Sequence, residues 1–159
     1  MEAPIIRQLD ATTLAGLRVR MSASDNRIPQ LWQSFMPRRR ALAAASGGLY
    51  SVEVYDPGHF DAYDPQRLFD KWAAVAVAPD APLPEGLERL AIPAGTYAVF
   101  THRGPAATAP ATYAHIFTQW LPASNYRVDE RPHFALMPYG YRPDDPDAEE
   151  TIWIPVRPR

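Results

Sequence analysis

The sequence predicts an α+β fold in which one antiparallel sheet carries two helices on one face. Segments with the two-residue alternation of strands are interrupted twice by a segment with the i, i+3, i+4, i+7 spacing of an amphipathic helix. The order of two strands, one helix and two strands also occurs twice along the 159 residues, which indicates a duplicated unit. Two such units side by side predict a continuous pseudo-twofold sheet, with both helices behind it and a ligand cleft in front.

The first repeat, about residues 1–82, begins with a predicted hairpin. Its predicted strands are residues 5–9, 14–21, 49–55 and 72–77. Asp25 or Asn26 is placed to cap the helix, and Pro29 is tolerated in a first turn, where the missing N–H has no intrahelical partner. The apolar stripe of this helix contains Pro37, so a kink or an end is expected there.

The second repeat, about residues 83–159, follows the same order within the same single domain. Its predicted strands are residues 90–92, 96–102, 132–137 and 149–156, of which the first two form a hairpin. Thr108 or Thr112 is expected to cap its helix. The helix landmark Phe35 recurs as Trp120, a shift of 85 residues that supports the duplication.

Composition excludes several classes of function. The chain has no cysteine, which removes disulfides, thiolate metal ligands and a cysteine nucleophile. A formal net charge of −2 offers no general attraction for nucleic acid or an anionic membrane. The four histidines lack the spacing of a metal site, so we expect no metal and no cofactor. No signal peptide and no membrane-spanning apolar run are seen, so a cytoplasmic protein is expected.

Alternation along the strands assigns side chains to the two faces of the predicted sheet. In each strand, the set of alternate residues with mostly aliphatic side chains is expected on the helix side. These residues are Val52, Val54, Val75, Val77, Phe134, Leu136, Ile152 and Ile154. The other alternate residues of the same strands are expected on the open face. They are Ser51, Glu53, Tyr55, Trp72, Ala74, His133, Ala135, Met137, Glu149, Thr151 and Trp153. Indoles, a phenol and carboxylates together suit a flat apolar or cationic ligand, because rings attract cations and a carboxylate supplies counter-charge.

The predicted ligand-binding residues are the larger members of the open face. They are Glu53, Tyr55, Trp72, His133, Met137, Glu149, Thr151 and Trp153. Two other interpretations remain open. Polar side chains on the wet face of an antiparallel sheet need no function. The two tryptophans could also lie beneath a loop at about residues 56–64.

Several blocks of this sequence, in order, resemble the gyrase-inhibitor-like (GyrI-like) small-molecule-binding domains. These are also the effector-binding domains of AraC-type bacterial transcription activators. The blocks are Leu31 to Arg39, Leu49 to Pro57, Phe69 to Val75, Ile92 to Phe100, Trp120 to Ser124, Arg131 to Phe134 and Asp144 to Val156. The resemblance implies a cleft that binds bulky hydrophobic compounds, often cationic and of the multidrug type, between aromatic rings and beside a buried acid.

Two departures from that family pattern concern the acid. Many relatives carry glutamate where this sequence has Ala135 and Thr151. The candidate acids here are therefore Glu53 and Glu149, with Glu150 if the strand register differs by one residue. The resemblance also implies a stand-alone domain without a helix-turn-helix.

Three functions are predicted from these observations. The leading one is binding of a hydrophobic small molecule, with a cation as one option, in an aromatic cleft between the two repeats and without direct contact with nucleic acid or membrane. The first alternative is a hydrolase of electrophilic small molecules with Glu53 as general base. The second is a module that binds a protein partner, gyrase or a regulator.

Overall fold

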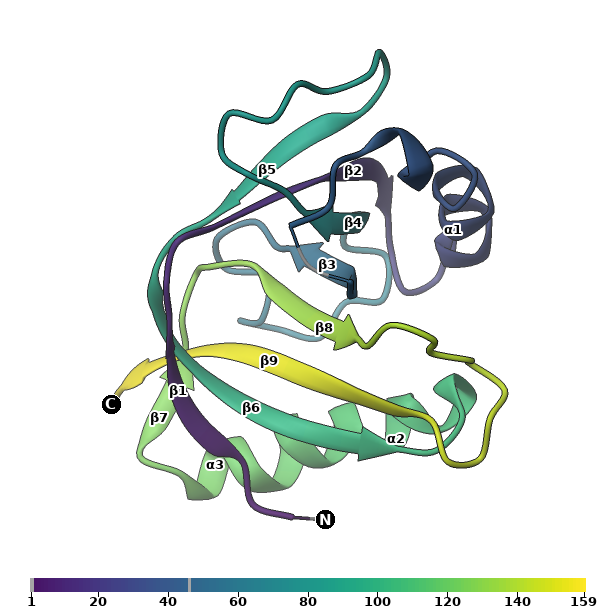
Figure 1. The fold of residues 1–159 in the computed structure, drawn as a ribbon. Coiled ribbons are helices and arrows are strands. Elements are labelled where there is room, and N and C mark those ends of the chain that lie inside the picture. The colour runs from purple at the N-terminus through teal and green to yellow at the C-terminus, as the bar shows by residue number, and fades with distance from the viewer. Residues whose placement is uncertain (1, 46) are drawn as a thin grey trace.

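A computed structural model describes residues 2–45 and 47–159, and its strands form one nine-stranded antiparallel sheet (Figure 1). The strands are β1 (Ile5–Leu9), β2 (Thr12–Met21), β3 (Leu49–Val54), β4 (Phe69–Ala76), β5 (Glu88–Ile92), β6 (Gly95–Arg103), β7 (Tyr126–Val128), β8 (His133–Met137) and β9 (Glu149–Pro158). Their order is β1-β6-β9-β8-β3-β4-β2-β5, and β7, which the sequence did not predict, pairs with β9. The α+β class with helices on one face is confirmed.

The helical segments fall where the two apolar stripes predict them. They are α1 (Ile28–Phe35), η1 (Arg39–Ala41), η2 (Ala106–Thr108), α2 (Ala109–His115), the π-helical η3 (Ile116–Trp120) and α3 (Leu121–Ala123). The Ile28 backbone N–H donates to Asn26 Oδ1 at 3.0 Å, so Asn26 holds the first turn. α1 ends before Pro37, as predicted. The segment from η2 to α3 continues through Pro122 and ends at Ala123.

The two predicted hairpins do not form. β1 pairs with β6 and β5 pairs with β2, so each short strand joins the opposite half of the sheet. A two-residue hairpin turn needs positive φ at its first central residue, but proline at Pro93 fixes φ near −65°. No non-glycine residue of the described ranges has positive φ. The chain therefore bends at each connection and continues as one arc (Figure 1), which interlocks the two halves.

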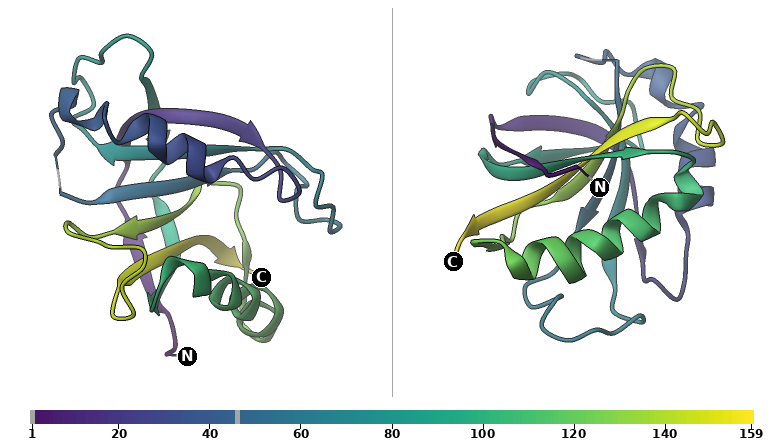
Figure 2. Two further views of the ribbon diagram at one scale, coloured as in Figure 1. Left: turned by 90° about the vertical axis from the view of Figure 1, so that its right-hand side faces the viewer. Right: turned by 90° about the horizontal axis from the view of Figure 1, so that it is seen from below.

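The helices cover two separate parts of one sheet face (Figure 2). Leu31 and Phe35 of α1 pack on β2 and β4, in a cluster with Ala15, Ala73, Val75 and Val77. Ile116 of η3 packs on β6 and β9, in a cluster with Ala98, Phe100, Ile152 and Ile154. The central strands β3 and β8 lie between these two clusters. We call the helix-side strip over β3 and β8 the seam.

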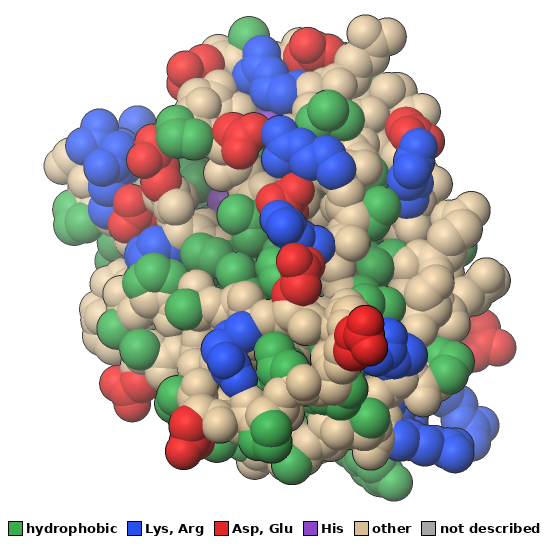
Figure 3. Space-filling view, turned by 90° about the horizontal axis from the view of Figure 1, so that it is seen from above, with side chains coloured by type: hydrophobic (Ala, Val, Ile, Leu, Met, Phe, Trp, Pro, Cys, Tyr) green, Lys and Arg blue, Asp and Glu red, His purple; other side chains and the backbone are tan. Residues whose placement is uncertain are grey.

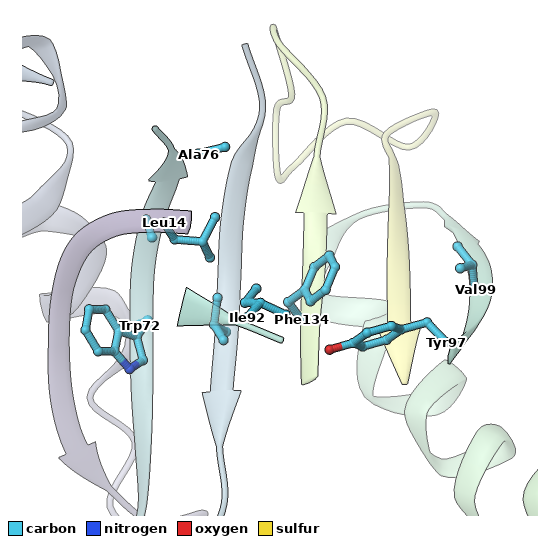
Figure 4. Packing of buried hydrophobic residues seen from close by; sticks show 9 residues of the cluster. Leu14, Trp72, Ala76, Ile92, Tyr97, Val99 and Phe134 are labelled. Atoms are coloured by element: carbon cyan, nitrogen blue, oxygen red, sulfur yellow. The ribbon is translucent and has the colours of Figure 1, made fainter. Parts of the chain in front are cut away.

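The opposite, front face of the sheet is itself a hydrophobic core. One cluster joins strands from both ends of the sheet and includes Leu14, Trp72, Ile92, Tyr97 and Phe134 (Figure 4). The neighbouring strands β2 and β4 approach each other very closely at Gly16. A Cβ at Gly16 would lie 1.9 Å from the Ala73 carbonyl oxygen, so only glycine fits there. The predicted open face is therefore largely packed.

The register corrects the predicted faces of β3 and β8. One cross-strand row on the front face runs Trp72, Val52, Phe134, Trp153. Val54 and Leu136 share this face, whereas Glu53, Tyr55, His133, Ala135 and Met137 lie on the helix side. The assignments for β4 and β9 agree with the structure. On these central strands the aliphatic side chains pack in the front core, and the helix side carries Ser51, Glu53 and His133, so the rule that aliphatic side chains face the helices fails there.

Candidate functional site

The predicted site residues divide between the two faces of the sheet. Trp72, Glu149, Thr151 and Trp153 lie on the front. Glu53, Tyr55, His133 and Met137 lie on the helix side, along the seam. The structure therefore places four of these residues on each face and does not unite the eight.

On the front face, the two predicted indoles do not share a hollow. Trp72 is only 5% exposed. Trp153 stacks on Phe134 with ring centroids 5.2 Å apart. Val52 and Phe134 separate the two indoles in their row, so the strands that carry them are about 14 Å apart, from three strand spacings. The front face thus holds these rings as packing.

A pocket of about 400 Å³ does open beside that row. It is lined by Gly48, Thr101, Leu136, Pro138, Glu149, Glu150 and Thr151. Two of its polar side chains are already engaged, since Trp153 Nε1 donates to Thr151 Oγ1 at 3.0 Å and Arg103 pairs with Glu149 at 2.7 Å. The Glu149 pair is well exposed, which limits its electrostatic strength.

The seam contains a buried ion pair. Glu53 lies between Lys71 on β4 and His133 on β8 in one cross-strand row. Lys71 Nζ donates to Glu53 Oε1 at 2.9 Å, and Lys71 is only 4% exposed. The hydrolase alternative required a free Glu53 carboxylate as general base. In this structure that carboxylate already accepts a hydrogen bond from an ammonium.

A second carboxylate, Glu150, reaches the helix side from β9. It stands opposite His102 of β6 and is 8% exposed. His102 instead contacts the start of α2, with Nδ1 at 2.7 Å from Thr112 Oγ1 and Nε2 at 3.0 Å from Thr108 Oγ1. The Glu150 carboxylate makes no hydrogen bond or ion pair with any residue of the described ranges. Burial raises its pKa and Glu53 adds to the rise, while His102 and Lys71 oppose it.

Phenol rings stand near these two carboxylates. Burial raises the pKa of Tyr113 on α2 well above its ordinary value, and the charges of Glu53 and Glu150 raise it further. Burial and Glu53 likewise raise the pKa of Tyr55. The hydroxyl of Tyr141 is buried without a hydrogen-bond partner among the described residues. The seam therefore combines acids with aromatic surface and an unused polar group.

One end of the seam is closed by Phe60, which comes from the loop between β3 and β4. Its ring stacks on Phe117 of η3 at 5.6 Å and on His133 at 5.5 Å. Tyr55 packs edge-on against His133 at 4.9 Å. Burial, with smaller effects of His59 and Arg131, lowers the pKa of His133 to about 3, which keeps this imidazole neutral. The stack thus joins the two halves across the seam.

A small pocket of about 170 Å³ opens beside this stack. Tyr55, His59, Phe60, Arg131 and His133 are among its lining residues. Ligand pockets usually measure about 300–1,000 Å³, so a bulky ligand would have to displace a covering side chain. Phe60 is 49% exposed and is the covering ring with least packing to lose.

Sequence reasoning missed four contributors to the seam, namely Phe60, Lys71, Tyr113 and Phe117. Lys71 had a readable signal, because it shares the parity of Ala73, Val75 and Val77, which pack under α1. A lysine on the helix side of a buried strand needs a partner. Tyr113 and Phe117 lie on the second helical segment and were not among the predicted site residues. Phe60 had no signal, since its position depends on the path of a long loop.

Two further observations limit the chemistry of the described residues. No group of three histidine, aspartate or glutamate side chains among them could hold a metal ion. None of their helices is long and apolar enough to cross a membrane.

Comparison with known proteins places this architecture in a family. The family model described as the GyrI-like small molecule binding domain matches residues 2–157. The transcriptional regulator BrlR of Pseudomonas aeruginosa is 29% identical over 157 residues, which cover 98% of this chain and 56% of BrlR. The chain thus spans about half the length of that curated relative.

Solved structures share the fold. SAV2435 bound to tetraphenylphosphonium has a TM-score of 0.72 and 16% identity, with 99% of this chain and 94% of that chain covered. The C-terminal domain of EcmrR has a TM-score of 0.69 and 15% identity, with 98% of each chain covered. With the family match over nearly the whole sequence, these findings show that the chain belongs to the GyrI-like family of small-molecule-binding domains.

Proposed function

We propose that the seam binds a hydrophobic small molecule that carries one positive charge. The observation that carries this proposal is Glu150, a residue that is only 8% exposed and whose carboxylate makes no hydrogen bond or ion pair with the described residues. An unpaired buried charge is unfavourable in the free protein, and a bound cation would remove that penalty. The charges of the acids raise the pKa of the Tyr55 and Tyr113 phenols, and a cation held against one of these rings would gain about 0.5–2 kcal/mol of cation–π attraction.

The comparisons support a ligand of this class. SAV2435, which shares the fold, is bound to tetraphenylphosphonium, a monocation surrounded by phenyl rings. The same combination of charge and aromatic surface matches the acids and rings of the seam. Tetraphenylphosphonium is therefore the first probe for this protein.

Direct contact with nucleic acid is not part of the proposal. Figure 3 shows one face on which basic and acidic side chains lie side by side. Arg18 pairs with Glu88 at 2.8 Å and with Asp70 at 3.5 Å, and Arg20 pairs with Asp56 at 2.7 Å. Such mixed charges give no continuous basic surface for a phosphate backbone.

Isothermal titration calorimetry with tetraphenylphosphonium tests the proposal on a matched pair of variants. Glu150→Gln removes the buried carboxylate, whereas Glu149→Gln removes its exposed neighbour on the front face. We expect Glu150→Gln to weaken binding about tenfold to a hundredfold, from loss of one charge contact at an effective dielectric near 20. Glu149→Gln should bind like the wild type.

The reverse result would place the ligand in the front pocket beside Thr151 and Trp153. No binding by a folded wild-type sample to this or any other aromatic cation would contradict the proposed function. Far-ultraviolet circular dichroism of each variant shows whether a loss of binding follows from unfolding.

A further inference from the structure

Lys71 places a positive charge inside the proposed binding site. Its side chain is 5% exposed and its ammonium lies 2.9 Å from Glu53 Oε1. Lys71 also opposes the rise in the pKa of the Glu150 carboxyl. One lysine therefore binds Glu53 directly and acts through its charge on Glu150, which comes from the other half of the sheet.

The charges along the seam do not cancel. Glu53 and Glu150 carry two negative charges when ionised, and Lys71 returns one positive charge. His133 is neutral, because burial lowers its pKa to about 3. With His102, which stands opposite Glu150, also counted as neutral, the strip between the helices is left with one unbalanced negative charge.

We infer that Lys71 is an internal counter-charge that sets the number of positive charges the ligand carries. This inference rests on the proposed function of the seam. With Lys71 in place, a ligand with one positive charge neutralises the site. A second positive charge would face the lysine ammonium without a carboxylate of its own, in surroundings that screen it poorly.

Lys71 is thus a specificity-determining residue. Rings and apolar walls supply contact area for any hydrophobic ligand, and the ammonium discriminates against excess positive charge. Repulsion of this kind excludes unwanted ligands, whereas added attraction alone would admit them.

Four proteins form a charge series that tests the inference. Glu53→Gln leaves the seam neutral, the wild type carries one negative charge, and Lys71→Met carries two. The double variant Lys71→Met/Glu53→Gln again carries one, but without the ion pair. Each is titrated calorimetrically at pH 8 with tetraphenylphosphonium, with the dication methyl viologen and with uncharged triphenylphosphine oxide.

We expect tetraphenylphosphonium to bind Lys71→Met about tenfold more tightly than the wild type, and Glu53→Gln about tenfold more weakly. The double variant should stay within about threefold of the wild type. Methyl viologen should gain more than the monocation from Lys71→Met, since it carries twice the charge. Triphenylphosphine oxide should change little across the series.

The results distinguish failure of the role given to Lys71 from failure of ligand binding in the seam. If the wild type binds tetraphenylphosphonium but affinity does not follow the order of net charge, Lys71 serves packing alone and the inference is wrong. If none of the four folded proteins binds any of the three probes, the proposed function fails. Lys71→Met leaves Glu53 buried without its partner and is the variant most at risk of unfolding. In that event the double variant must still bind the monocation about tenfold more tightly than Glu53→Gln.

Discussion

The buried carboxylate of Glu150 lowers the stability of the folded chain and, in the proposed site, raises the affinity for a cationic ligand. A buried carboxylate without a partner destabilises the folded chain once it ionises, and burial raises its pKa in response. The folded protein therefore holds this proton more tightly than the unfolded chain does. Glu150 contributes its full stabilisation at a pH below the pKa that its carboxyl has in the unfolded chain. This stabilisation is lost as the pH rises through the pKa that the carboxyl has in the folded protein.

We accordingly predict that Glu150→Gln is more stable than the wild type at pH 8 and equal to it near pH 4. The expected gain at pH 8 is roughly 1–2 kcal/mol, because a neutral amide replaces a buried charge. Urea unfolding of both proteins across this range measures the difference, and the other titrating groups are common to both. A difference that does not change with pH would mean that Glu150 is already neutral or already solvated.

Single residues also mark the limit of what the sequence could reveal. Glu53, Tyr55 and His133 remain predicted ligand contacts, but their face, which was assigned from their aliphatic neighbours, was wrong. Glu150 was reached only as a reserve for a shifted register. No such shift occurs, and Glu150 faces the helices on the same parity as Ile152 and Ile154. The sequence did contain a sign of both buried charges. Glu150 and Lys71 each alternate with apolar residues of the same strand that face the helices.

At the scale of elements, the loop between β3 and β4 covers the site. It carries Phe60 across to η3, where the ring stacks with Phe117 and with His133. A half-exposed ring contributes less to stability than a buried one, so this contact can open at low cost. A bulky ligand has to pass this ring because the pocket beside it is small.

We predict that Phe60→Ala increases the association rate of tetraphenylphosphonium by roughly tenfold and lowers Tm by only a few degrees. Stopped-flow fluorescence measures the rate. Tyr63→Ala in the same loop is the control, since Tyr63 is 91% exposed. An unchanged association rate with faster dissociation would mean that Phe60 holds the ligand and does not cover its path.

The elements themselves were largely predictable. Periodicity located eight of the strands and both main helices, because alternation and the 3.6-residue stripe reflect one covered face. β7 was missed because Tyr126–Val128 is too short to show alternation. The pairing of β1 and β5 was missed because strand partners depend on contacts distant in sequence. Pro93 was the local sign that no tight hairpin turn forms there.

At the scale of the whole molecule, burial of both sheet faces elsewhere is why we propose the seam as the place for a ligand. The helices cover the outer strands of one face, and the curved sheet packs its front face on itself. β1 and β5 exchange between the halves, so the seam lies where both halves contribute wall residues. Glu53 comes from one half, whereas Glu150 and Tyr113 come from the other.

A crystal structure of the protein with tetraphenylphosphonium would show where the ligand lies. We expect the phosphonium on the helix side of β3 and β8, within contact of Glu150 and Tyr113, with the Phe60 ring displaced from Phe117. Density for the ligand in the front pocket against Trp153 and Thr151, with the seam unchanged, would contradict this expectation.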